Sequence, residues 1–73
     1  MLVEIYTRDG CTLCEEKKAQ LRSQNVPFTE YVIDKDVTRD SVKAAFPRAR
    51  MLPVIVVDGV WTKDDSRLQM LLG

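Results

Sequence analysis

The chain has 73 residues, of which 45% are hydrophobic and 30% are charged, and its eleven basic and eleven acidic side chains give a formal net charge of +0. This length leaves room for one small domain with a thin core, and the composition is that of a folded domain rather than a disordered tail. Zero net charge provides no overall attraction to nucleic acids or to membrane surfaces, so we expect neither as a partner.

The first predicted element follows Met1 directly. Residues 2–7 are mainly β-branched, aliphatic and aromatic, which is typical of a mostly buried strand. No run of residues approaches the length of a membrane span, and a strand at this position leaves no room for a leader peptide. We therefore expect a cytoplasmic protein. In that reducing compartment, two lone cysteines are more often catalytic, redox-sensing or metal-binding than a structural disulfide.

The stretch after this strand holds both cysteines. Residues 8–10 form a turn with a glycine at its end, and Cys11 and Cys14 follow where a predicted helix begins. The unpaired N–H groups and the positive dipole end of a helix N-terminus stabilise a thiolate at Cys11 and lower its pKa. Cys14 lies about one turn farther on nearly the same face, so it can attack a mixed disulfide formed at Cys11. The spacing predicts redox chemistry in which one thiol attacks and the other resolves.

Metal binding by one chain is disfavoured, because a structural zinc site needs four ligands and the chain has two cysteines and no histidine. We therefore expect no resident metal and no bound cofactor. A metal or an iron–sulfur cluster shared between two chains stays open, with further ligands supplied by a partner chain or by small thiols.

A helical pattern runs from Thr12 to about Asn25, where Pro27 ends it. One stripe of this helix is formed by four residues: Leu13, Cys14, Lys17 and Leu21. We interpret Lys17 and Lys18 as part of a solvated face. Residues 28–33 form a second strand, so the first three elements predict a right-handed βαβ unit with parallel strands.

The second half of the chain predicts four further elements. Thr38 is a good N-cap for a short helix over residues 39–46, with Val42, Ala45 and Phe46 as its apolar face. A β-branched run over residues 53–58 predicts a buried strand, and Asp58-Gly59 predicts a tight turn into a partner strand over residues 60–62. Residues 64–72 predict a final helix. The expected order is β-α-β-α-β-β-α in one domain over residues 1–73.

Several short motifs carry a family resemblance. They are Ile5-Tyr6-Thr7, Cys11-x-x-Cys14, Lys18, Phe28-x-Glu30, Leu52-Pro53-x-Ile55 and Asp58-Gly59. Through them the chain resembles the glutaredoxin branch of the thioredoxin-like superfamily, nearly from end to end. The resemblance implies a thioredoxin-like α/β fold with three helices and a four-stranded mixed sheet of order 2-1-3-4, in which the third strand is antiparallel to the first. It also implies a cis peptide bond before Pro53.

The same resemblance implies a thiol-disulfide oxidoreductase that reduces protein disulfides or glutathione mixed disulfides, with Cys11 as nucleophile and Cys14 as resolving thiol. It implies glutathione as the reductant and disulfide-containing proteins as partners, and we expect a monomer. The candidates for contacting glutathione or a substrate are Arg8, Thr12, Leu13, Arg50, Leu52, Pro53, Lys63, Asp64 and Asp65. The guanidinium groups of Arg8, Arg48 and Arg50 suit a ligand carboxylate, and the backbone of Leu52 suits an extended substrate segment.

Two departures from the glutaredoxin pattern leave the electron donor open. Thr12-Leu13 stand where the family commonly has Pro-Tyr, and residues 63–67 stand where it usually has Gly-Gly and an Asp pair that hold the γ-glutamyl end of glutathione. The simpler interpretation of Trp61 is packing. This residue nevertheless also makes the chain similar to redoxins that accept electrons from thioredoxin reductase and donate them to ribonucleotide reductase. That is the alternative function. A non-catalytic iron–sulfur carrier or an adaptor is the alternative from another class.

Overall fold

The computed structural model describes residues 2–49 and 51–62. The elements are β1 (Val3–Thr7), α1 (Thr12–Ser23), β2 (Thr29–Val32), α2 (Arg39–Ala45), β3 (Val54–Val57) and β4 (Val60–Thr62). Each one agrees with its predicted range to within two residues at either end. The helix predicted over residues 64–72 lies outside the described residues. Among the described helices, none has the length and apolar character needed to cross a membrane.

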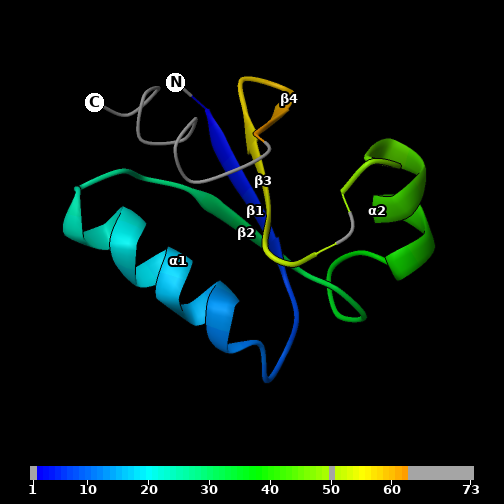
Figure 1. The fold of residues 1–73 in the computed structure, drawn as a ribbon, viewed down its shortest axis with the longest axis horizontal. Coiled ribbons are helices and arrows are strands. Elements are labelled where there is room, and N and C mark those ends of the chain that lie inside the picture. Colours follow the sequence, from blue (N-terminus) through cyan, green and yellow to red (C-terminus); the bar gives the residue numbers. More distant parts are fainter. Residues whose placement is uncertain (1, 50, 63–73) are drawn as a thin grey trace.

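The four strands form one mixed sheet of order β2-β1-β3-β4, as the resemblance implies (Figure 1). β1 is parallel to β2 and antiparallel to β3, and Ile5 in the middle of β1 is opposite Glu30 on one side and Ile55 on the other. β3 and β4 form an antiparallel hairpin. As a result, the ends of β1 and β2 and the beginning of β3 meet at one end of the sheet.

Two core clusters lie on opposite faces of this sheet, because alternate residues of a strand point to opposite sides. Val3 and Ile5 of β1 pack with Leu21 of α1 in the first cluster, whereas Tyr6 packs against the second cluster, which contains Val42 of α2. The sheet is therefore the middle layer between α1 and α2, which stand on different sides of it in Figure 1.

Three local predictions are confirmed. The side chain of Thr38 caps α2 by accepting a hydrogen bond from the backbone N–H of Ser41 at 3.1 Å. Asp58 and Gly59 both have positive φ, 51° and 82°, as a tight two-residue hairpin turn requires. The peptide bond between Leu52 and Pro53 is cis.

The predicted faces of the two helices are wrong at three positions. α1 buries Cys14, Lys18 and Leu21, which are spaced for one face of a helix, and Leu13 is turned away from that face and is 51% exposed. Lys18 is thus not on a solvated face. On α2, Ala45 is exposed because this short helix contacts the core through Val42 and Phe46.

Candidate active site

The two-cysteine turn and the cis-proline corner lie at the same end of the sheet. Tyr6 is the last residue of β1 that pairs with β3, and its partner is Val54. Because this pairing is antiparallel, the residues after Tyr6 and the residues before Val54 leave the sheet at the same end. The chain after Tyr6 leads into Cys11, and the chain before Val54 contains Pro53. Loops that are far apart in the sequence therefore converge at this end.

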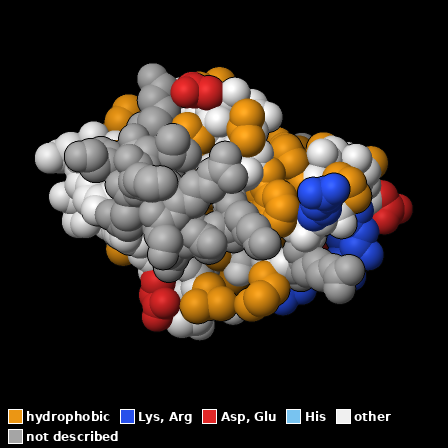
Figure 2. All heavy atoms as spheres, turned by 45° about the horizontal axis from the view of Figure 1, so that its top comes forward, with side chains coloured by type: hydrophobic (Ala, Val, Ile, Leu, Met, Phe, Trp, Pro, Cys, Tyr) orange, Lys and Arg blue, Asp and Glu red, His pale blue; other side chains and the backbone are white. Residues whose placement is uncertain are grey.

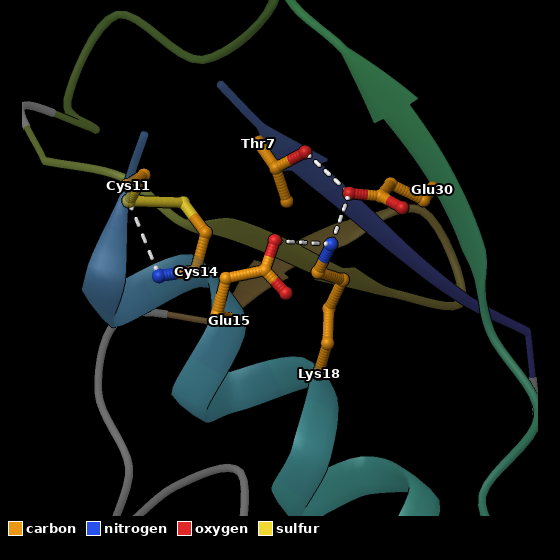
Figure 3. Close-up of a disulfide and its surroundings, with 6 residues drawn as sticks. All are labelled: Thr7, Cys11, Cys14, Glu15, Lys18 and Glu30. Atoms are coloured by element: carbon orange, nitrogen blue, oxygen red, sulfur yellow. Dashed lines mark hydrogen bonds and ion pairs between the residues drawn. A yellow bond between two sulfur atoms is a disulfide. The ribbon is translucent and has the colours of Figure 1, made fainter. Parts of the chain in front are cut away.

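Cys11 and Cys14 form a disulfide at the start of α1, with their Cα atoms 5.2 Å apart (Figure 3). Cys11 is the N-cap residue of the helix, and its Sγ accepts a hydrogen bond from the backbone N–H of Cys14 at 3.1 Å. This N–H is one of the donors at a helix start that lack a partner within the helix. Donors of this kind stabilise negative charge on a sulfur atom.

The two sulfurs differ in accessibility. Cys14 is 1% exposed, whereas Cys11 is only half-buried. Gly10 enters this turn with a φ of 77°, a backbone conformation that side chains disfavour. Thr12 and Leu13 are exposed in the first turn of α1. A molecule that approaches the disulfide from solvent thus meets Cys11 together with these two side chains.

A buried ion pair lies one helical turn beyond Cys14. Lys18 is 8% exposed, and its Nζ is 2.9 Å from a carboxylate oxygen of Glu30 on β2 and 2.9 Å from one of Glu15. The hydroxyl of Thr7 donates a 2.6 Å hydrogen bond to the same oxygen of Glu30. Figure 3 shows the Lys18 side chain running from α1 toward Glu30 on β2, with its other partner, Glu15, on the same helix. The network links α1 to β1 and β2 about one helical turn beyond the disulfide.

Both members of this pair, Lys18 and Glu30, are favoured in their charged forms. The hydrogen bond from Thr7 and the one from Lys18 hold the pKa of the Glu30 carboxyl below its usual value, in spite of partial burial. Hydrogen bonds to Glu30 and to Glu15 raise the pKa of Lys18, although burial acts in the opposite direction. Near neutral pH, therefore, Lys18 carries its proton and Glu30 does not.

The remaining predicted site residues occupy different places. Arg8 and Leu52 line one groove beside the turn, and Pro53 is half-buried at the cis bond. Arg48 is exposed on a turn and does not belong to the described lining of this groove. Four other candidates lie outside the described residues: Arg50, Lys63, Asp64 and Asp65.

Two features of this region were missed in the sequence. Arg39 and Lys43 line the same groove as Arg8, and their spacing of four residues on a predicted helix was the available signal. The ion pair of Lys18 with Glu30 was also missed. The available signal was that both residues belong to the family motifs. The pattern of charges along α1 alone does not reveal the pair.

Comparison with known proteins agrees with this geometry. The glutaredoxin family model matches residues 3–61. A probable glutaredoxin of Synechocystis sp. is 39% identical over 57 residues, which are 77% of this chain and 65% of that protein, so the chain spans less than two thirds of this relative.

Two solved structures have a similar fold. Glutaredoxin 1 of Francisella tularensis, crystallised with cacodylate, matches with a TM-score of 0.71 and 25% identity over 93% of this chain and 87% of that one. The thioredoxin-like protein BC3987 matches in fold with a TM-score of 0.73 and 23% identity over 97% and 99% of the two chains. With its Cys11–Cys14 disulfide on a thioredoxin-like fold, the chain belongs to the glutaredoxin family.

Proposed function

We propose that the protein is a dithiol oxidoreductase that reduces protein disulfides and glutathione mixed disulfides through Cys11 and Cys14. The observation that supports this most is the pair of sulfurs at the start of α1. Cys11 is half-buried and its Sγ accepts the Cys14 N–H at 3.1 Å, while Cys14 is 1% exposed. An accessible, stabilised thiolate suits the attacking role, and a protected thiol within the same turn suits the resolving role.

The proposed reaction starts from the reduced dithiol. The Cys11 thiolate attacks one sulfur of the substrate disulfide and forms a mixed disulfide, and the other substrate sulfur leaves as a thiolate that takes up a proton. Cys14 then loses its proton and attacks the Sγ of Cys11, which releases the second substrate sulfur for protonation. The substrate gains two electrons and two protons, and the protein ends with the Cys11–Cys14 disulfide. Two glutathione thiols restore the dithiol and become glutathione disulfide.

The residues around Cys11 are proposed to hold the substrate. Thr12 and Leu13 are exposed on the turn that carries Cys11, so they contact a group bound to its sulfur. The backbone of Leu52, before the cis Pro53, suits an extended segment that pairs with it as a strand does. Arg8 lines the adjoining groove, where its guanidinium suits a carboxylate.

The test is a reduction assay with two electron donors, followed through NADPH consumption. One arm uses glutathione and glutathione reductase with 2-hydroxyethyl disulfide, and the other uses thioredoxin reductase with insulin disulfides. We expect turnover in the glutathione arm that disappears in the Cys11→Ser variant. Inactivity of reduced, folded protein in both arms would contradict the proposal. Turnover with thioredoxin reductase alone would favour the redoxin that serves ribonucleotide reductase.

A further inference from the structure

A groove of about 620 Å³ extends from the candidate active site along α2. Arg8 lines it from the turn that leads to Cys11, and Leu52 lines it from the residue before Pro53. The rest of the lining comes from the two residues after β2, from α2, from the loop between α2 and β3, and from the first residue of β3. Figure 2 shows hydrophobic side chains next to lysine and arginine side chains at the α2 end of the molecule. The groove therefore begins beside the two loops that carry Cys11 and Pro53.

The floor and one edge of the groove are apolar. Ile33, Val42 and Val54 form the buried part of its lining, and Leu52 is half-buried. Met51 at the edge is 71% exposed, more than any other large hydrophobic side chain among the described residues. Methionine is flexible and makes adaptable contacts at binding surfaces. This surface favours an occupant that carries apolar side chains.

The rim of the groove is cationic. Among the described residues, Arg8, Arg39 and Lys43 line it together with a single acid, Asp34, so this part of the lining carries two net positive charges in a chain whose overall charge is +0. Within the described part of the chain, none of the three cations forms an ion pair or a side-chain hydrogen bond. Arg39 and Lys43 are also one turn apart on α2, where like charges repel each other weakly. An anionic ligand would relieve this repulsion.

We propose that the groove binds an acidic, partly apolar segment of the protein whose disulfide is reduced, with carboxylates placed a few residues from the reactive cysteine. This proposal rests on the proposed function and names its substrate class. Arg8 meets a carboxylate close to the cysteine, and Arg39 and Lys43 meet carboxylates farther along the segment. Apolar side chains between them lie over the floor. Glutathione supplies carboxylates but no large apolar side chain, so it leaves the floor and Met51 uncovered.

The test measures single-turnover oxidation of the prereduced protein by two synthetic peptide disulfides, with acid quenching and mass spectrometry, so that no electron donor is involved. The peptides are identical except that one has glutamate and the other glutamine at two positions beside the cysteine. For the unmodified protein we expect the glutamate peptide to react about 5-fold faster at low salt. The ratio should approach one at about 1 M salt, where the screening length is about 3 Å.

Charge reversal on α2 identifies the groove as the source of this preference. In the Arg39→Glu/Lys43→Glu variant the glutamine peptide should react faster than the glutamate peptide, and Arg39→Gln/Lys43→Gln should give an intermediate ratio. Arg22→Glu, a reversal in the last turn of α1, is the matched control and should keep the original preference. Because each ratio compares two substrates of one variant, a general loss of activity does not imitate the effect.

Three outcomes would overturn the inference. One is equal reaction of the unmodified protein with both peptides, and another is an unchanged ratio after the α2 reversals. The third is a loss of reactivity toward glutathione disulfide in the reversed variant as large as the loss toward the glutamate peptide, which would assign the cations to glutathione. If the prereduced protein reacts with neither the peptide disulfides nor 2-hydroxyethyl disulfide, the proposed function itself is refuted.

Discussion

Replacing Lys18 with methionine removes the charge from a residue that is 8% exposed and leaves Glu30 without its cation. Removing one partner of a buried ion pair destabilises a protein by about 3–5 kcal/mol. The Glu30 side chain is 27% exposed and keeps the hydrogen bond from Thr7, so part of this loss is recovered through solvent and through that bond. We therefore expect Lys18→Met to lower the free energy of unfolding by about 2 kcal/mol. Domains of this size have a total of about 4–11 kcal/mol.

The matched control is Lys35→Met. Lys35 forms an ion pair with Asp9 at 3.0 Å, nearly the same length as the Lys18–Glu30 pair, but the two side chains are 63% and 73% exposed. The same substitution here should change the free energy of unfolding by less than about 0.5 kcal/mol. Both variants are compared with the unmodified, oxidised protein by urea denaturation at pH 7. Equal losses in the two variants would refute the claim that burial makes the Lys18 pair important.

The pH dependence of unfolding provides a second readout of the same pair. The lowered pKa of Glu30 stabilises the folded protein above the pKa of an unfolded glutamate, about 4.3, and this contribution disappears as the pH falls through the lower folded value. The raised pKa of Lys18 stabilises the fold below about pH 10, and this contribution disappears as the pH rises through the folded value. In Lys18→Met, the loss of stability at alkaline pH should be smaller than in the unmodified protein.

Other substitutions test local features by urea denaturation. Leu21→Ala removes a side chain that is 0% exposed and should lower the free energy of unfolding by about 2–5 kcal/mol. Thr38→Ala removes the cap of α2 and should lower it by about 1 kcal/mol, while Thr38→Asn keeps most of the stability. A Cβ added at Gly59 meets no atom of the described residues within 4 Å, so the expected loss of about 1 kcal/mol in Gly59→Ala comes from the φ of 82°. Unchanged stability in any of these variants would contradict the corresponding role.

Local sequence signals predicted much of the fold. The β-branched run before Asp58, the cap at Thr38 and the proline that ends the first helix each depend on a few neighbouring residues, and the structure has all of these elements. The strand order and the cis bond before Pro53 came from the family resemblance. Because the cysteines lie directly at a predicted helix start, the candidate site could be located before the structure was known.

Features that depend on contacts between distant residues could not be predicted in this way. Lys18 resembles its exposed neighbours on α1, and it is buried only because Glu30 faces the same side of the sheet as Ile5. The cationic rim has the same origin. Arg39 and Lys43 are ordinary surface residues of a short helix until packing places α2 beside Arg8. In both cases partners on separate elements decide the environment of a charge.

The division of roles between Cys11 and Cys14 is tested most directly by trapping the mixed disulfide. Each reduced single variant, Cys11→Ser and Cys14→Ser, is mixed with glutathione disulfide, quenched with acid and examined by mass spectrometry. We expect Cys14→Ser to accumulate one glutathione adduct on Cys11 rapidly, while Cys11→Ser stays unmodified because Cys14 is 1% exposed. The unmodified protein should end as the Cys11–Cys14 disulfide. Adduct formation on Cys14 at a rate similar to that on Cys11 would contradict the account.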